Sequence, residues 1–198
     1  DPDKRVGLIV DEWGSWLAVE PGTNPGFLYQ QNTIRDGMIA SLTLNIFQRH
    51  TDRIRMANIA QVVNVLQSMI LTDTIGTGQM VLTPTYYVFK MYRGFQDATY
   101  LPMDVTTDSM NVEGGHMFKM VNGKIPDVSV SAARKKDGSF IISLANTSLD
   151  KAQATKIILD VTKIKTVNGD ILTSDKINDY NDFNNPDKVK EKVFKDAK

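Results

Sequence analysis

The first apolar run of the chain, residues 6–10 (Val-Gly-Leu-Ile-Val), stops abruptly at Asp11, Glu12 and Trp13. The run is too short for a helix and is rich in branched aliphatic side chains, which predicts a strand buried on both faces. An ionised carboxylate inside such a strand would cost several kcal/mol, so we expect Glu12 where the strand emerges. In barrels and open sheets of parallel strands, this carboxyl-terminal edge carries the catalytic groups. Glu12 is therefore the first candidate for catalysis.

The first hundred residues alternate between strand and helix patterns. Apolar residues recur every four positions over residues 34–46, and Asn32 or Thr33 is a suitable N-cap. The apolar stretch 56–71 begins as a short strand, and Thr83-Pro84 predicts the start of a second helix. The apolar face of that helix would consist of Val88, Met91 and Phe95. Strand, helix, strand, helix is the repeating unit of α/β architecture.

From about residue 101 the period changes to two. Alternating runs at 128–132 and 140–144 flank Asp137-Gly138, which predicts a β-hairpin with a tight turn. Residues 157–161 predict a further strand, Asn168-Gly169 another turn, and residues 188–195 the entry to one more strand. Several short strands joined by such turns indicate an antiparallel sandwich. We place the domain boundary between residues 99 and 100.

Composition narrows the function classes. The chain has 198 residues, with 23 Lys and Arg against 23 Asp and Glu, so no net field favours nucleic acid or a membrane surface. It contains no cysteine, which excludes disulfides, thiolate zinc sites and a cysteine nucleophile. No apolar stretch is long enough to span a bilayer.

Two tryptophans, Trp13 and Trp16, follow the carboxylate of Glu12 within one short loop. Flat aromatic faces beside a carboxylate suit a sugar ring, whose C–H groups pack on them while its hydroxyls bond at the edges. The alternative is that the tryptophans fill the core, as large aromatic side chains usually do. For an arbitrary glutamate, a surface position without function would be the better interpretation.

Three amides, Asn58, Gln61 and Asn64, are spaced by three within the second apolar stretch. Buried amides need partners, which are either backbone groups or a ligand. A structural role is the better prior for each of them, and Gln61 is the best placed to reach into a pocket.

The remaining candidates indicate ordinary structure. His50 and His116 have no acidic or histidine neighbours at metal-ligand spacing, so we expect both in surface positions or loops. The oxygen-rich segment 178–187 lacks the glycine and the final glutamate of a calcium loop, which favours a solvated turn. We therefore expect no metal and no cofactor. No phosphate-binding glycine loop and no serine nucleophile elbow occur.

Several ordered motifs resemble the α-L-arabinofuranosidases of glycoside hydrolase family 51. The resemblance rests on residues 7–14 (GLIVDEWG), 20–23 (EPGT), 28–32 (LYQQN), 55–65 (RMANIAQVVNV), 82–86 (LTPTY) and 185–189 (NPDKV). It implies a (β/α)8 TIM barrel followed by a jelly-roll-like antiparallel β-sandwich. Residues 1–99 would then hold the last two βα units of the barrel, and residues 100–198 the sandwich without its last strand, so that both domains are incomplete.

By the same resemblance, Glu12 corresponds to the catalytic nucleophile, Gln61 to a residue that hydrogen-bonds the arabinose, and Trp16 to an aromatic residue lining that subsite. The family mechanism is retaining hydrolysis of arabinan- and arabinoxylan-type saccharides by two glutamates. The complete enzyme would be a homo-oligomer, and cytoplasmic and exported locations are both compatible with the residues.

The chain departs from the family at the acid/base glutamate, which follows an asparagine in the family, whereas no Asn-Glu pair occurs here. We therefore expect the chain alone to be a C-terminal fragment that does not hydrolyse arabinosides at a useful rate. Two alternatives stay open: a carbohydrate-binding or structural β-sandwich module, and a retaining glycosidase with another sugar preference.

Overall fold

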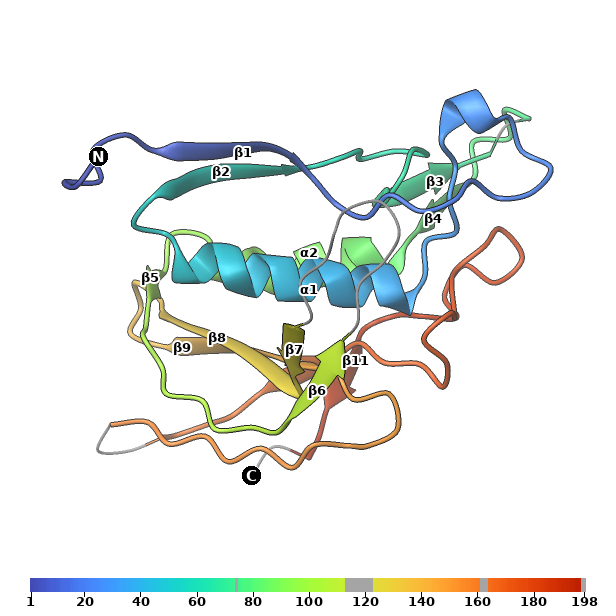
Figure 1. Ribbon diagram of the computed structural model, residues 1–198. Coiled ribbons are helices and arrows are strands. Elements are labelled where there is room, and N and C mark those ends of the chain that lie inside the picture. The colour runs from blue at the N-terminus through green and yellow to red at the C-terminus, as the bar shows by residue number, and fades with distance from the viewer. Residues whose placement is uncertain (74, 113–122, 161–163, 197–198) are drawn as a thin grey trace.

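The computed structural model describes residues 1–73, 75–112, 123–160 and 164–196, and these are arranged in three layers (Figure 1). A two-stranded ribbon lies on one side of two helices, and a small antiparallel sheet lies on the other side. The ribbon pairs β1 (Leu8–Trp13) with β2 (Ile54–Ile59). The helices are α1 (Ile34–Arg49) and α2 (Pro84–Tyr92), and the sheet contains β5 (Thr99–Tyr100), β8 (Val128–Arg134) and β9 (Phe140–Asn146).

The N-terminal half confirms the predicted alternation of strand and helix. Strand β1 leads through α1 to β2, which lies parallel to it, so the three elements form a βαβ unit. The strand begins two residues later than the apolar run and continues through Trp13. Glu12 is therefore the penultimate residue of the strand, at the end where it emerges. The register is irregular between Val10 and Trp13, where the strand ends.

The prediction that β1 is buried on both faces is wrong for the described structure. The side chains of Leu8 and Ile9 are 48% and 55% exposed. Within the described residues, β2 is the one strand that pairs with β1. A strand with a single neighbour keeps a free edge and a partly uncovered face. The apolar composition of this strand thus exceeds what its present neighbours cover.

Helix α1 begins at the predicted cap but buries a different face. Thr33 is the N-cap, and its backbone N–H donates to Oδ2 of Asp36 at 2.8 Å, which is half of a capping box. The face that is buried carries small and polar side chains, including Gly37, Ala40 and Asn45, whereas Ile46 of the predicted apolar stripe is 46% exposed. This face carries small residues because α2 packs close against it. A Cβ on Gly37 would lie 3.4 Å from the Cβ of Pro84.

Helix α2 starts at Thr83-Pro84 as predicted. The Oγ1 atom of Thr83 accepts from the N–H of Tyr86 at 3.4 Å and donates to the carbonyl of Ser68 at 2.8 Å. Pro84 occupies the first helical position, where its missing N–H costs nothing. Val88 of the predicted apolar face is buried, and Phe95 falls in the following 3-10 turn η2 (Arg93–Phe95).

The predicted hairpin is confirmed in the second half. Strands β8 and β9 pair antiparallel from Val128 with Asn146 to Arg134 with Phe140, and Gly138 in the turn has φ +85°. A left-handed φ of this kind favours glycine. The predicted strand at 157–161 is not found: residues 151–160 form no regular strand, and Val161 lies outside the described residues.

Short strands complete the fold. In the described ranges they form three two-stranded sheets, and the 3-10 turn η1 precedes α1. The strands are β3 (Ile70–Thr72), β4 (Met80–Leu82), β6 (Ser109–Val112), β7 (Gly123–Pro126), β10 (Gly169–Ile171) and β11 (Lys192–Phe194), and η1 spans Pro25–Phe27. Strand β11 lies within the tail that was predicted to begin a strand. No helix in the described ranges is long and apolar enough to cross a membrane.

Candidate functional site

Glu12 and Gln61 lie at the same edge of the β1–β2 ribbon. Because the two strands run parallel, their carboxyl ends meet, and the N–H of Ala60 donates to the carbonyl of Trp13 at 2.9 Å. Glu12 and Gln61 are each one residue from this bond. Both side chains are exposed, and the Ala60–Gln61 peptide bond is cis. Residues 49 positions apart are thus brought together by strand pairing.

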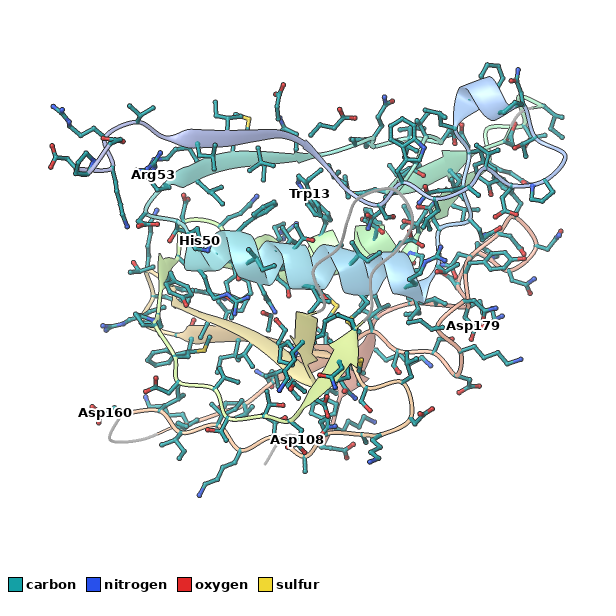
Figure 2. All side chains as sticks on the ribbon, in the orientation of Figure 1. Trp13, His50, Arg53, Asp108, Asp160 and Asp179 are labelled. Carbon is teal, nitrogen blue, oxygen red and sulfur yellow. The ribbon has the colours of Figure 1, made fainter. Side chains whose placement is uncertain are left out.

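The two tryptophans take different positions. The ring of Trp13 packs edge-on against Phe47, with centroids 5.4 Å apart, and stacks on Phe89 at 5.9 Å. Figure 2 shows Trp13 between the ribbon and α1. Trp16, three residues later, is 69% exposed. Trp13 therefore fills the core, whereas the Trp16 ring is largely exposed.

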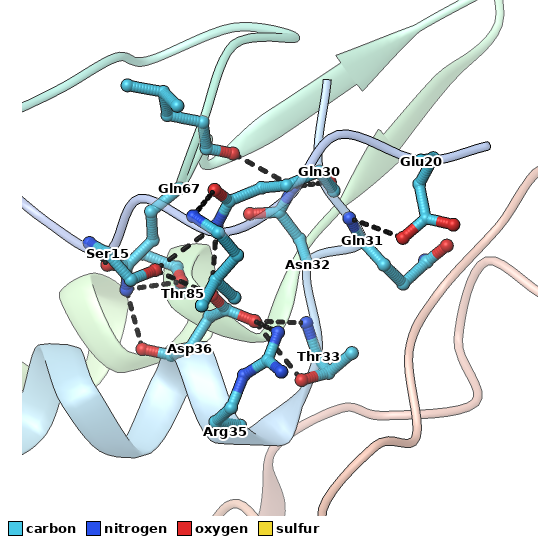
Figure 3. A network of polar contacts seen from close by, with 12 residues as sticks. Ser15, Glu20, Gln30, Gln31, Asn32, Thr33, Arg35, Asp36, Gln67 and Thr85 are labelled. Atoms are coloured by element: carbon cyan, nitrogen blue, oxygen red, sulfur yellow. Dashed lines mark hydrogen bonds and ion pairs between the residues drawn. The ribbon is translucent and has the colours of Figure 1, made fainter. Parts of the chain in front are cut away.

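The buried carboxylate of Asp36 lies next to Ser15, in the loop that carries Trp16 (Figure 3). Its side chain is completely buried, and it lies in the first turn of α1. Oδ1 accepts from the hydroxyl of Ser15 at 2.8 Å and from Nε2 of Gln30 at 3.3 Å. Oδ2 accepts from the N–H and the hydroxyl of Thr33, at 2.8 and 3.1 Å, and lies 3.4 Å from a guanidinium nitrogen of Arg35. Position in the first turn adds the favourable field of the helix N-terminus.

Two glutamine side chains join Asp36 to the loop backbone, Gln30 through the carboxylate and Gln67 through the main-chain carbonyl. Oε1 of Gln67 accepts from the N–H of Ser15 at 2.8 Å, and its Nε2 donates to the Asp36 carbonyl at 2.6 Å and to Thr85 Oγ1 at 3.2 Å. Oε1 of Gln30 accepts from the N–H of Leu17 at 2.9 Å. Gln67 is completely buried and Gln30 is 1% exposed, so water does not compete for these bonds.

Gly14 lets the chain pass from the strand into this loop. Its φ is +147°, and a Cβ there would lie 3.4 Å from both the Ala60 carbonyl oxygen and Gln67 Oε1. A side chain at position 14 would therefore strain the backbone and crowd the glutamine. Backbone conformation and lack of space therefore explain why the Asp-Glu-Trp-Gly motif ends in glycine.

The other two amides of the second apolar stretch do not join the site. Asn58 is exposed on β2. Asn64 exchanges two hydrogen bonds with Thr72, from Nδ2 to Oγ1 and from the Thr72 N–H to Oδ1, both at 2.8 Å. This pairing ties the loop after Gln61 to β3. Asn64 is half-buried and has this structural role, whereas the Gln61 side chain is exposed.

Sequence reasoning missed Asp36, Gln30 and Gln67, although one signal could have found the first. Thr33 to Asp36 has the spacing of a capping box, with aspartate in the place of the usual glutamate. The two glutamines have no local signal, because the loop N–H groups that they accept from lie 13 and 52 residues away in the chain.

The remaining candidates add no second site. His50 is exposed at the C-terminal end of α1, and His116 lies outside the described residues. Within the described ranges, no group of three or more His, Asp or Glu side chains is arranged to hold a metal ion. The segment 178–187 is more than a solvated turn: Asp179 is 8% exposed and Asn181 1% exposed, and both hold the segment to its surroundings.

Residues 11–198 match the family described as the α-L-arabinofuranosidase C-terminal domain. The chain belongs to this family. The chain is 53% identical, over all 198 of its residues, to an intracellular exo-α-L-arabinofuranosidase of Bacteroides ovatus. It spans 37% of the length of that relative. The resemblance drawn from its motifs is therefore confirmed.

Solved structures agree with this family assignment. The crystal structure of the family 51 arabinofuranosidase of Xanthomonas axonopodis pv. citri superposes with a TM-score of 0.84 at 44% identity, covering 98% of this chain and 37% of that one. An α-L-arabinofuranosidase of Thermotoga maritima in an arabinose complex shares the fold, with a TM-score of 0.74 at 23% identity, over 95% of this chain and 38% of that one.

Proposed function

We propose that this chain carries the nucleophile side of the active site of a retaining α-L-arabinofuranosidase. The substrates would be saccharides of the arabinan and arabinoxylan type, from which terminal α-L-arabinofuranosyl residues are removed. One observation carries the proposal: Glu12 and Gln61 share a strand edge. They do so in a chain that is 53% identical throughout to a protein named exo-α-L-arabinofuranosidase.

The architecture that we propose follows the family. Residues 1–99 would contribute the seventh and eighth βα units of a (β/α)8 barrel, with β1 and β2 as neighbouring barrel strands. Their parallel pairing and the two helices behind them support this assignment. Residues 100–198 would belong to a jelly-roll-like β-sandwich, and the antiparallel β8–β9 hairpin supports that part. Leu8 and Ile9 at the start of β1 are apolar and about half exposed, as expected of an inner barrel strand whose other neighbours are not part of this chain.

Each site residue has a proposed chemical role. The carboxylate of Glu12 attacks the anomeric carbon, and the glycosidic oxygen leaves with a proton from a second glutamic acid about 5 Å away. The arabinosyl ester on Glu12 is then hydrolysed by water, which that second residue activates as a base. Gln61 would hydrogen-bond the sugar hydroxyls, and the free face of Trp16 would pack against the ring.

The chain by itself should be inactive. The acid/base glutamate of the family has no counterpart in its sequence, and general-acid assistance is typically worth about 10²–10⁴-fold. Glu12 and Gln61 are exposed at a bare strand edge, so the sugar also lacks most of its positioning contacts. Activity requires a protein that supplies the rest of the barrel.

The test joins the chain to the N-terminal part of its Bacteroides ovatus relative, by fusion or by mixing, with 4-nitrophenyl α-L-arabinofuranoside as substrate. Glu12→Gln should lower kcat by at least about 10³-fold, because the nucleophile is lost. Asp11→Asn is the matched control, since it neutralises an exposed carboxylate next to Glu12 to which the proposed mechanism assigns no role. The anomeric form of the first product, followed by proton NMR, should be retained.

Three results would contradict the proposal. These are full activity of the Glu12→Gln variant, inversion at the anomeric carbon, and carbohydrate binding without turnover that Glu12→Gln leaves unchanged. The last result would favour a carbohydrate-binding module.

A further inference from the structure

The peptide N–H groups on both sides of Trp16 are held by buried side chains, while the Trp16 ring itself is free. The Ser15 N–H donates to Gln67 and the Leu17 N–H donates to Gln30. The indole between them is 69% exposed. An exposed aromatic ring normally samples several orientations, and ordering it costs free energy when a ligand binds.

Asp36 holds both glutamines in place. Its carboxylate accepts from Gln30 Nε2, and its backbone carbonyl accepts from Gln67 Nε2. The same carboxylate accepts from the hydroxyl of Ser15, so three separate contacts run from one residue to the Trp16 loop and its supports. Each amide group is thereby oriented with its oxygen toward the loop N–H.

The geometry points to Asp36 as a positioning residue that presents Trp16 to the sugar through Gln30 and Gln67. This inference rests on the proposed function, since it takes Trp16 as a sugar-binding surface. Asp36 itself does not touch the substrate: it is completely buried and lies behind the loop. It acts by fixing the backbone of residues 15–17, and that backbone carries the ring and follows directly on the strand of Glu12.

Asp36→Asn is the direct test, because it keeps the shape of the side chain and replaces one acceptor oxygen by a donor. Either Ser15 and Gln30 or Thr33 would then face an N–H₂ group instead of an acceptor. Gln30→Met is a second variant, which keeps most of the volume and removes the acceptor of the Leu17 N–H. Asn45→Ala is the matched control, because Asn45 is equally buried on α1 but its bonds run to Ser129, Tyr92 and Ser143.

The first readout uses the chain alone. The two indole N–H signals in a ¹⁵N-labelled sample report on Trp13 and Trp16, and a Trp16→Phe sample assigns them. In Asp36→Asn and Gln30→Met the heteronuclear NOE of Trp16 should fall and hydrogen exchange at the Leu17 amide should accelerate, whereas the Ser15 amide, which Gln67 holds through the Asp36 backbone carbonyl, should change less. In Asn45→Ala, at matched folded fraction, both should keep their wild-type values. Unchanged NOE and exchange in both site variants would overturn the inference.

The second readout uses the joined enzyme described above. Asp36→Asn and Gln30→Met should lower kcat/KM for the nitrophenyl arabinofuranoside by roughly 10–100-fold, mainly through KM. A merely destabilised enzyme loses active molecules, so its kcat falls and its KM stays constant. Equal KM values for wild type and both variants would also overturn the inference. An inactive joined wild-type enzyme would instead refute the proposed function and leave the positioning role to the NMR result.

Discussion

One residue, Asp179, attaches the C-terminal segment to the start of α1. Asp179 forms an ion pair with Lys188 at 2.7 Å and accepts a hydrogen bond from Ser174, and its backbone carbonyl accepts from the Ile34 N–H at 2.9 Å. The Lys188 ammonium, followed by the Ser174 hydroxyl, lowers the pKa of the Asp179 carboxyl from 3.8 to about 2. The segment that begins α1 is thereby tied to a segment more than 140 residues later.

This lowered pKa predicts acid sensitivity. The folded chain keeps Asp179 ionised where the unfolded chain already binds a proton, so its contribution to stability is complete above about pH 4 and is lost as the pH falls towards 2. Asp73, whose pKa is also lowered to about 2 by hydrogen bonds from Thr77 and Gln79, acts in the same window. Asp179→Asn should therefore reduce, and not abolish, the dependence of Tm on pH between 2 and 5.

Thermal unfolding followed by circular dichroism at several pH values checks this prediction. Lys188→Met serves as the partner variant, because it removes the main cause of the shift and should also flatten the curve. An Asp179→Asn protein with the same slope as wild type would mean that the ion pair does not influence folding.

At the scale of elements, Thr83 connects the start of α2 to the loop before β3. Its hydroxyl caps the helix through the Tyr86 N–H and also donates to the Ser68 carbonyl, and the side chain is completely buried. Ser68 is next to Gln67, so the helix start also supports the loop that holds the Trp16 segment. The Thr83 hydroxyl thus links the N-terminus of α2 to the loop that contains Gln67.

Thr83→Ala should lower the free energy of unfolding by roughly 1–2 kcal/mol, because it removes a cap and leaves the Ser68 carbonyl unpaired. Thr83→Ser retains the hydroxyl and should cost less than half as much. Urea unfolding of the three proteins measures the difference. If the serine and alanine variants were equally destabilised, the methyl group and not the hydroxyl would be responsible.

At the scale of the whole molecule, Asn45 links the helical layer to the antiparallel sheet. Its Nδ2 donates to Ser129 Oγ at 3.1 Å, and its Oδ1 accepts from the hydroxyls of Tyr92 at 2.8 Å and Ser143 at 2.6 Å. Burial raises the pKa of Tyr92 to about 12, so its hydroxyl stays protonated and remains a donor across the ordinary pH range. Side chains from both helices and from both strands of the hairpin thus meet at this single amide.

Asn45→Ala should lower the free energy of unfolding by about 2–3 kcal/mol, since it leaves the buried Ser129 hydroxyl without its partner and removes the acceptor that Tyr92 and Ser143 share. Tyr92→Phe removes one donor while Ser143 still satisfies Oδ1, and should cost about 1 kcal/mol. The double variant should be less destabilised than the sum, because both changes affect the same hydrogen bond. Strict additivity in chemical denaturation would show that the two residues act independently.

Local patterns determined the elements that depend on neighbouring residues. Thr83-Pro84 predicts a helix start because capping is chemistry between residues three apart, and Asp137-Gly138 predicts a hairpin because the turn needs a left-handed φ. The strand 157–161 was predicted on the same grounds and is not found over residues 151–160, since alternation alone cannot supply a pairing partner.

Residue order by itself thus determined the strand–helix alternation, the hairpin, the family and the candidates Glu12, Gln61 and Trp16, because periodicity, caps and motifs lie within short stretches. Only the tertiary structure decided that Trp13 is packed and Trp16 is free, that small and polar residues of α1 are buried, and that Asp36 stands behind the loop. The physical reason is that these outcomes depend on contacts between Ser15, Gln30, Asp36 and Gln67, which chain folding brings together from three separate segments.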